Sequence, residues 1–205
     1  MVTCVNLAIT DLCDRSCPEC CCDIPKIKKH WIISIEGLKR AANALKGIQR
    51  VTLTGGEPSM HPMFNEIVWA SKELFNCKSL ELSTNGRCFN GDHKILEFFD
   101  KIIVSRYDAP EFESNSLLIE KGLKNTDICS KIEVWGVHHI SRLNRGTKKC
   151  PRGYFETISL YKDRVYPCCM GWGVEGFPSV ELDNDWEKKV TSLELPCKIC
   201  FFAEK

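Results

Sequence analysis

Three cysteines stand close together near the start of the chain, in the segment Cys13-Asp14-Arg15-Ser16-Cys17-Pro18-Glu19-Cys20. They follow an extended apolar run over residues 5–9, so we expect them on a loop that leaves the end of a strand. Closely spaced thiolates select soft metal centres, namely iron-sulfur clusters, zinc or copper(I). Three cysteines leave one iron of a 4Fe-4S cluster open to an outside ligand, whereas a structural zinc site is closed by four ligands. The triplet therefore predicts a metal site, which is reactive if it holds a cluster.

Two further motifs follow predicted strands. Gly55-Gly56-Glu57-Pro58 comes directly after the strand predicted over residues 51–54, and Ser83-Thr84-Asn85-Gly86 comes after residues 80–82. Each motif alone is compatible with ordinary turn chemistry. The spacing Cys-x3-Cys-x2-Cys, followed in order by these two motifs, resembles the radical S-adenosylmethionine (radical SAM) superfamily over roughly the first 140 residues.

The resemblance implies a role for the three cysteines. Cys13, Cys17 and Cys20 would bind a 4Fe-4S cluster, whose open iron takes the amino and carboxylate groups of the methionine part of S-adenosylmethionine. One electron from the reduced cluster would then cleave the cofactor into methionine and a 5'-deoxyadenosyl radical, which takes hydrogen from the substrate. The sequence assigns no catalytic side chain beyond this.

The resemblance also implies residues that bind the cofactor. Glu57 and the backbone of Gly55 and Gly56 would contact the methionine amino group. Asn85 and Ser105, at the ends of the next two predicted strands, would face its ribose or carboxylate, because sites in barrels of this kind lie at the carboxyl ends of the strands.

Strands and helices alternate along the first two thirds of the chain, which predicts parallel βαβ units and an α/β fold. Strands are predicted over residues 2–9, 51–54, 79–83, 101–105 and 132–138, and helices over 35–45, 64–75, 95–99 and 117–123. Ser34 is the predicted N-cap of the first helix. Residues 140–149 are too polar for a sixth strand, and 205 residues are too few for a complete eight-stranded barrel. We predict a shortened, partial (β/α)6-type TIM-like barrel.

The character of the sequence changes at Cys150. Residues 157–161 and 164–166 predict a β-hairpin, and three loops supply a set of four thiols: Cys150, Cys168 or its neighbour Cys169, Cys197 and Cys200. This set resembles the twitch domain, a shortened relative of the SPASM domain that holds one auxiliary 4Fe-4S cluster, and its Tyr-Pro-Cys pattern favours Cys168. We therefore divide the chain into a radical SAM barrel over 1–149 and a twitch-like domain over 150–205. A structural zinc ribbon is the alternative for these cysteines.

Composition limits which partners and which cellular compartment we expect for the protein. A net charge of +1 gives no reason to propose a nucleic-acid or membrane-surface partner. The 14 cysteines would suggest disulfides in a secreted chain, but no signal-peptide pattern is visible and Asp11 interrupts the only early apolar stretch. No apolar run approaches the roughly 20 residues that cross a bilayer. We expect a cytoplasmic protein whose cysteines bind metal.

These features predict a radical SAM enzyme that acts on a small molecule or a peptide and receives electrons from a donor such as flavodoxin or ferredoxin. An auxiliary cluster with four thiolates has no open iron and would relay a second electron, which favours net oxidation of the substrate. Position alone suggests side chains for the substrate pocket: Tyr107, Asp108, Trp135 and Trp172.

Three alternatives stay open at this point. Two are enzymes, an activase that places a glycyl radical on a protein partner and an enzyme that modifies RNA. The third is a non-catalytic scaffold that binds zinc or iron-sulfur, in which Cys21, Cys22 or His30 would complete a zinc knuckle with the first three cysteines.

Overall fold

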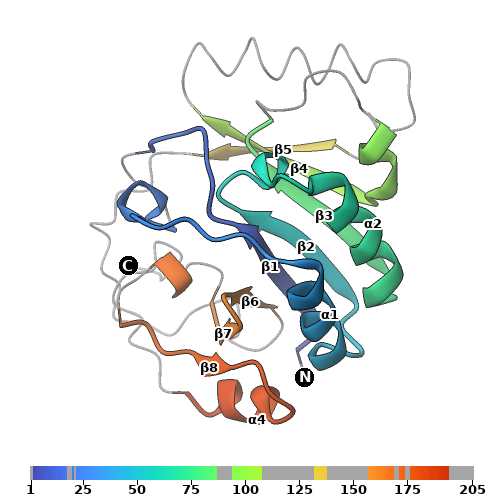
Figure 1. Ribbon diagram of the computed structural model, residues 1–205, viewed down its shortest axis with the longest axis vertical. Coiled ribbons are helices and arrows are strands. Elements are labelled where there is room, and N and C mark those ends of the chain that lie inside the picture. The colour runs from blue at the N-terminus through green and yellow to red at the C-terminus, as the bar shows by residue number, and fades with distance from the viewer. Residues whose placement is uncertain are drawn as a thin grey trace.

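The computed structural model describes residues 2–17, 20, 22–86, 94–107, 132–137, 157–168, 171–173 and 176–193 (Figure 1). Its strands are β1 (Cys4–Thr10), β2 (Arg50–Gly55), β3 (Ser79–Thr84), β4 (Lys101–Tyr107), β5 (Ile132–Val137), β6 (Thr157–Tyr161), β7 (Arg164–Tyr166) and β8 (Val180–Glu181). The helices are α1 (Ile35–Ala44), α2 (Phe64–Phe75) and α4 (Trp186–Thr191), with short 3-10 helices η1 (Ile24–Lys26), η2 (Pro58–Met60), η3 (Lys94–Phe98) and η5 (Gly171–Gly173). Within these described ranges, no helix is both long and apolar enough to cross a membrane.

The strands form one sheet in the order β5-β4-β3-β2-β1-β6-β7-β8. Strands β1 to β5 are parallel to their neighbours, as the alternation of strands and helices predicts. Strand β6 lies on the other side of β1 and is also parallel to it, with Leu160 opposite Leu7. Strands β7 and β8 complete the sheet in antiparallel orientation. The predicted α/β fold class is confirmed.

The sixth parallel strand comes from the predicted C-terminal region. The hairpin predicted over residues 157–166 is present, and its strands β6 and β7 are joined by a tight turn at Lys162 and Asp163. Its first strand extends the sheet of the N-terminal part through β1. Residues 140–149, and the helix predicted over 117–123, lie outside the described residues.

The first helix begins where the sequence predicts it. Ser34 is the N-cap of α1, and its Oγ accepts a hydrogen bond from the backbone N–H of Gly37 at 3.1 Å. Helix α2 runs from Phe64 to Phe75, and the short helix predicted over 95–99 is the 3-10 helix η3. Each connects two parallel strands and returns the chain to the same side of the sheet.

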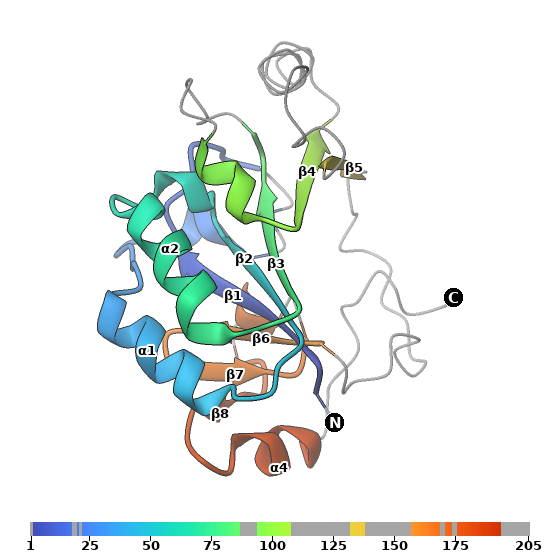
Figure 2. The same ribbon diagram turned by 90° about the vertical axis from the view of Figure 1, so that its right-hand side faces the viewer.

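One face of the sheet, called here the helix face, is covered by α1, α2 and η3 (Figure 2). The strand side chains on this face are apolar and buried in one core with the helices: Val5, Leu7, Ile9, Val51, Leu53, Leu80, Leu82, Ile102, Val104, Ile158 and Leu160. Because side chains alternate along a strand, the residues between them belong to the opposite face.

That opposite face, called here the polar face, carries mostly hydrogen-bonding side chains. The strand register aligns one row across five strands, consisting of Ser159, Asn6, Thr52, Glu81 and Lys101. Nearer to the carboxyl ends of the strands, Ala8 is aligned with Thr54, and Ser83 with Ile103. Parallel strands that are buried on both faces usually read as continuous apolar runs. The polar face departs from that rule and requires a functional explanation.

Candidate functional site

The predicted motifs meet where strands β1, β2 and β3 end. The backbone N–H of Gly56 donates to Thr10 O at 2.9 Å, and the N–H of Glu57 donates to Leu12 O at 2.7 Å. A Cβ on Gly55 would lie 2.0 Å from Thr10 O, and one on Gly56 would lie 2.2 Å from Leu12 O. Any side chain there would push the two loops apart. The two glycines therefore hold the loop after β2 against the cysteine loop, and the N–H of Gly56 is already engaged within the protein.

Glu57 is fully buried between the ends of β2 and β3. Its Oε1 accepts hydrogen bonds from Ser59 N–H at 3.2 Å, Ser59 Oγ at 2.6 Å and Thr84 Oγ1 at 2.7 Å. Its Oε2 accepts one from Asn85 N–H at 2.7 Å. Burial raises the pKa of Glu57, while these four donors oppose that shift because they stabilise the carboxylate. Oε2 has the capacity to accept a second donor, such as a ligand ammonium group.

Asn85 joins this carboxylate to the cysteine loop. Its side-chain Nδ2 donates to Asp14 Oδ1 at 2.7 Å, and Asp14 directly follows Cys13. Thr84 is fixed in turn, since its Oγ1 accepts a hydrogen bond from Gly86 N–H at 2.9 Å. Thr84 at the end of β3 and Asn85 directly after it thus hold both Glu57 and the loop that carries Cys13 in position.

Ser105 stands apart from this group of contacts. It lies on β4, half-buried on the polar face and opposite Trp135 of β5 in the register. Within the described part of the chain, no hydrogen bond joins Ser105 to the loops after β1, β2 or β3. Its predicted contact with the cofactor stays a prediction.

Cys13, Cys17 and Cys20 are partly buried thiols of one folded loop. The loop turns back on itself, because Cys20 N–H donates to Cys17 O at 3.2 Å and Asp23 N–H donates to Cys20 O at 3.1 Å. Burial raises the pKa of Cys13 to about 12, so a metal that binds this thiol must displace its proton.

This donor set fits an iron-sulfur cluster, because soft thiolates are its usual ligands. Among the described residues, no three Cys, His, Asp or Glu side chains converge closely enough to hold a single metal ion. A 4Fe-4S cluster does not require such convergence, since each thiolate binds a different iron.

An apolar group of side chains stands beside two of these cysteines. We call it the aromatic wall, and it consists of Ala8, Cys22, Ile24, Tyr161 and Trp172. Cys13 and Cys20 pack against it. The rings of Tyr161 and Trp172 are 4.4 Å apart between centroids, and Trp31 meets Tyr161 edge-on at 5.3 Å. The wall therefore combines residues from the cysteine region with residues from the C-terminal hairpin and the turn after it.

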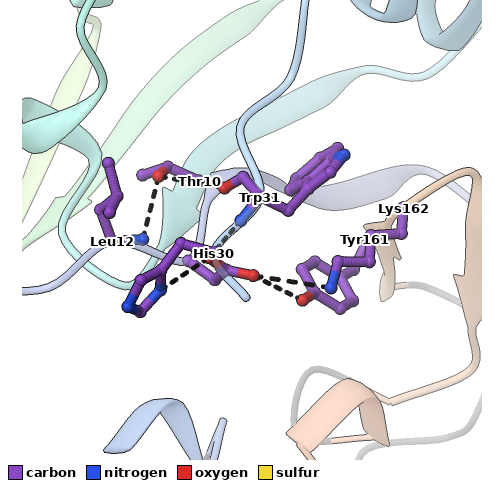
Figure 3. A network of polar contacts seen from close by, with 7 residues as sticks. Thr10, Leu12, His30, Trp31, Tyr161 and Lys162 are labelled. Carbon is purple, nitrogen blue, oxygen red and sulfur yellow. Dashed lines mark hydrogen bonds and ion pairs between the residues drawn. The ribbon is translucent and has the colours of Figure 1, made fainter. Parts of the chain in front are cut away.

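Asp11 joins the segment before α1 to the C-terminal hairpin. Figure 3 shows how His30 and Trp31 of that segment lie near Tyr161 and Lys162 of the hairpin. The carboxylate of Asp11 has no exposed surface, and its Oδ1 accepts a hydrogen bond from Trp31 N–H at 2.7 Å and lies 3.1 Å from His30 Nδ1. Its Oδ2 accepts a hydrogen bond from the Tyr161 hydroxyl at 2.7 Å and lies 3.7 Å from Lys162 Nζ. Burial, together with the neighbouring Asp11, raises the pKa of Tyr161, so this hydroxyl keeps its proton and donates it.

The predicted C-terminal metal site is described at one ligand only. Cys168 is partly buried, lies two residues beyond β7, and its carbonyl accepts a hydrogen bond from Gly171 N–H at 3.0 Å. Cys150, Cys197, Cys200 and the alternative ligand Cys169 lie outside the described residues. The auxiliary cluster stays a prediction.

Several residues that hold the site together were missed by sequence reasoning. His61 is buried, with Nε2 2.9 Å from Ile33 O and Nδ1 accepting from Met63 N–H at 3.0 Å, which ties η2 to the segment before α1. A polar residue directly after an apolar strand was a usable signal for Asp11. No local signal identifies Tyr161 as its partner, because their contact depends on the pairing of β6 with β1.

Comparison with known proteins agrees with this geometry. The sequence pattern of the Radical SAM superfamily matches residues 7–110. GTP 3',8-cyclase of Klebsiella pneumoniae (strain 342) is 33% identical over 87 residues, which are 40% of this chain and 26% of that protein. GTP 3',8-cyclase of Mannheimia succiniciproducens is 34% identical over 86 residues, again 40% and 26%. The chain thus aligns with about a quarter of the length of these relatives.

Solved structures share the fold over nearly the whole chain. The crystal structure of BtrN in complex with AdoMet and 2-DOIA has a TM-score of 0.65 at 14% identity and covers 95% of this chain and 83% of that one. Streptococcus suis SuiB bound to precursor peptide SuiA has a TM-score of 0.53 at 12% identity, covering 97% and 71%. At such identities the likeness concerns the fold alone. The family pattern extends over half of the sequence and includes all three motifs that meet at the strand ends, so the chain belongs to the radical SAM superfamily of enzymes.

Proposed function

We propose that this protein cleaves S-adenosylmethionine reductively and uses the resulting radical to take hydrogen from a small polar substrate. The observation that carries the proposal is the set of hydrogen bonds at the strand ends. They join Asp14 of the cysteine loop to Asn85, and Asn85 to the buried Glu57. Three motifs that are far apart in the sequence are thereby built into one rigid site.

The roles of the residues follow from their positions. Cys13, Cys17 and Cys20 would hold the 4Fe-4S cluster. When bound, the cluster and S-adenosylmethionine supply a 5'-deoxyadenosyl radical by one-electron reduction. Glu57 Oε2 would accept a hydrogen bond from the methionine ammonium group, and Asn85 would keep the cysteine loop at a fixed distance from that carboxylate. Rigid placement of this kind is what keeps a reactive species directed at one target atom.

The polar face supports a substrate that forms several hydrogen bonds. Thr54, Ser83 and Ser105 are half-buried, and their hydroxyls make no hydrogen bond to other described residues. The Oγ of Ser159 is buried without a partner in the described structure. Buried polar groups normally have partners. A substrate rich in hydroxyl or amine groups would supply them, whereas a peptide would do so only through polar side chains.

The C-terminal cysteines would add a second centre. In this proposal Cys150, Cys168, Cys197 and Cys200 hold an auxiliary 4Fe-4S cluster, which removes a second electron and makes the reaction a net oxidation. The division of the chain at residue 150 belongs to the same proposal. The β6–β7 hairpin would then serve both parts, since it carries the approach to Cys168 and extends the main sheet.

The first experiment measures iron, sulfide and zinc after anaerobic purification and reconstitution, together with 5'-deoxyadenosine formed from S-adenosylmethionine under reduction. About eight irons are expected with both clusters, and about four irons with one zinc if the C-terminal site is a zinc ribbon. Replacing Cys13, Cys17 or Cys20 by Ala should reduce cleavage to background. Cys77→Ala is the matched control, because Cys77 lies between α2 and β3 with its thiol donating to Ser79 O. Cleavage retained in any one of the three variants contradicts the assignment.

A second experiment tests the substrate class. Thr54→Val and Ser83→Ala should lower the amount of product formed from a polar substrate. Cleavage of S-adenosylmethionine in the absence of substrate should stay unchanged. GTP and a short apolar peptide serve as comparison substrates, because relatives are named GTP 3',8-cyclase and SuiB binds a precursor peptide. Conversion of the apolar peptide that is unaffected by either substitution would contradict a polar substrate.

A further inference from the structure

The aromatic wall places C-terminal residues against the cysteine loop. Tyr161 comes from the end of β6 and Trp172 from η5, and both are less than a tenth exposed. Cys13 and Cys20 pack against the aromatic wall, to which these two rings belong. The surroundings of two cluster ligands are therefore formed partly by residues that lie some 140 to 160 positions further along the chain.

The hairpin is held there by specific contacts. Tyr161 donates its hydroxyl hydrogen to the buried Asp11 at 2.7 Å. The next residue, Lys162, lies with its Nζ 3.7 Å from the same carboxylate and 4.7 Å from the centre of the Tyr161 ring. Lys162 and Asp163 both adopt positive φ angles, of 52° and 58°, as the two central residues of a two-residue hairpin turn often do. This tight turn brings Lys162 to Asp11 directly after Tyr161.

We propose that Tyr161 and Trp172 form the water-excluding wall of the cluster bound by Cys13, Cys17 and Cys20, and that they thereby lower its reduction potential. The inference rests on the proposed function, because it requires that these cysteines hold a cluster. It makes the C-terminal hairpin a part of the radical site, independently of any auxiliary cluster. Tyr161 and Trp172 are positioning and shielding residues in this proposal.

The physical reason is the charge added on reduction. One electron enters the cluster and makes it more negative, and water stabilises the added charge better than apolar side chains do. The potentials of such clusters accordingly depend on solvent exposure and on hydrogen bonds to their sulfur atoms. A wall opened to water should shift the potential to a more positive value.

The test compares three variants of the full-length, reconstituted protein. Trp172→Ala opens the wall, Tyr161→Phe removes the hydroxyl but keeps the ring, and Trp69→Ala removes a ring on α2 that is 55% exposed and lies on the helix-covered side. The potential is measured by a redox titration followed by electron paramagnetic resonance. Water access is measured in the same samples from the deuterium coupling of the reduced cluster after exchange into D2O.

We expect Trp172→Ala to shift the potential to a more positive value and to increase the deuterium coupling. Tyr161→Phe should do so to a smaller extent, and Trp69→Ala should change neither quantity. An unchanged potential and coupling in Trp172→Ala overturn the proposal. If that variant fails to fold, Trp172→Leu, which keeps an apolar side chain of smaller size, decides by the same two measurements. Absence of an iron-sulfur signal in the unmodified protein would instead overturn the proposed function.

Discussion

The helix face and the polar face are built from the same strands and differ in almost every side chain. On the helix face, Leu7, Leu53 and Leu82 are fully buried against the helices. On the polar face, one position further along β2 and β3, stand Thr54 and Ser83. The comparison shows that neighbouring residues of one strand have different roles. One set supplies stability through apolar burial, and the other is free to present hydrogen-bonding groups to a ligand.

Adjacent substitutions on β3 give the largest contrast. Leu82→Ala should lower the free energy of unfolding by about 2–5 kcal/mol, because a fully buried side chain leaves a cavity. Ser83→Ala should change it by less than about 0.5 kcal/mol, since its half-buried hydroxyl has no partner among the described residues. Urea unfolding of the cluster-free protein measures both. Similar losses of unfolding free energy for the two variants would show that the polar face contributes to stability as much as the helix face does.

Asp11→Ala tests a polar contact that does contribute to stability. The variant leaves the N–H of Trp31 and the hydroxyl of Tyr161 without their acceptor in a buried place. Each unsatisfied group costs about 1–3 kcal/mol, so for the two groups we expect a loss of about 2–6 kcal/mol. Glu36→Ala is the control, because the exposed Glu36 pairs with the exposed Lys39 on α1 and its loss should cost far less. Equal losses in thermal unfolding would remove Asp11 from the contacts that hold the hairpin.

Thr52→Val tests whether the buried polar side chains in the middle of the polar face stabilise the fold through hydrogen bonds to one another. Thr52 Oγ1 donates to Glu81 Oε2 at 3.1 Å, and both residues are buried. Loss of this donor should cost about 1–2 kcal/mol. Thr54→Val, two residues further along the strand and without such a partner, should be nearly neutral in the same urea titration. A larger effect at Thr54 would place the structural polar contacts nearer to the strand ends than the geometry indicates.

His61 should give the smallest effect, visible only as a dependence on pH. Burial lowers the pKa of His61, while its contact with Ile33 O and the charge of Glu66 oppose that shift. A base whose pKa is lower in the folded state contributes stability above its unfolded pKa of about 6.5, and this contribution is lost as the pH falls through the folded value. The unfolding free energy of the wild-type protein should therefore fall more between pH 7.5 and pH 5.5 than that of His61→Gln. Parallel profiles would contradict this.

Most of the N-terminal fold could be predicted because its signals are local. The Ser34 cap, the apolar spacing of α2 and the short apolar runs of β1 to β4 each identify an element within about ten residues. The joining of β6 to β1 could not be predicted. It depends on which strand edges remain unpaired once β1 to β5 are assembled, and no local pattern of residues records that.

In the site, too, residues with a local sequence signal could be predicted and residues that depend on long-range packing could not. The three cysteines, Glu57 and Asn85 were predicted from motifs, and the geometry brings the loops that carry them together. Gly55 and Gly56 also have a structural part that the motif did not predict, because their missing side chains allow contact between two loops, while their predicted contact with the cofactor stays a prediction. The buried carboxylate of Asp11 could not be assigned in advance, because its contacts arise only from packing across the sheet. Position suggested Trp172 for the substrate pocket, but no local signal placed its ring beside Cys13 and Cys20.

The position of β6 beside β1 also has a consequence for synthesis of the protein. Strand β1 is synthesised before β2 to β8, yet its edge that pairs with β6 stays unpaired until residues 157–161 have been made. The hydrogen bond between Asp11 and Tyr161 spans 150 positions of the chain. Contacts of such long range form late. The nascent chain thus carries Cys13, Cys17 and Cys20, the predicted cluster ligands, before Tyr161 and Trp172 have been made. A cluster inserted in that interval would meet an incompletely sheltered loop.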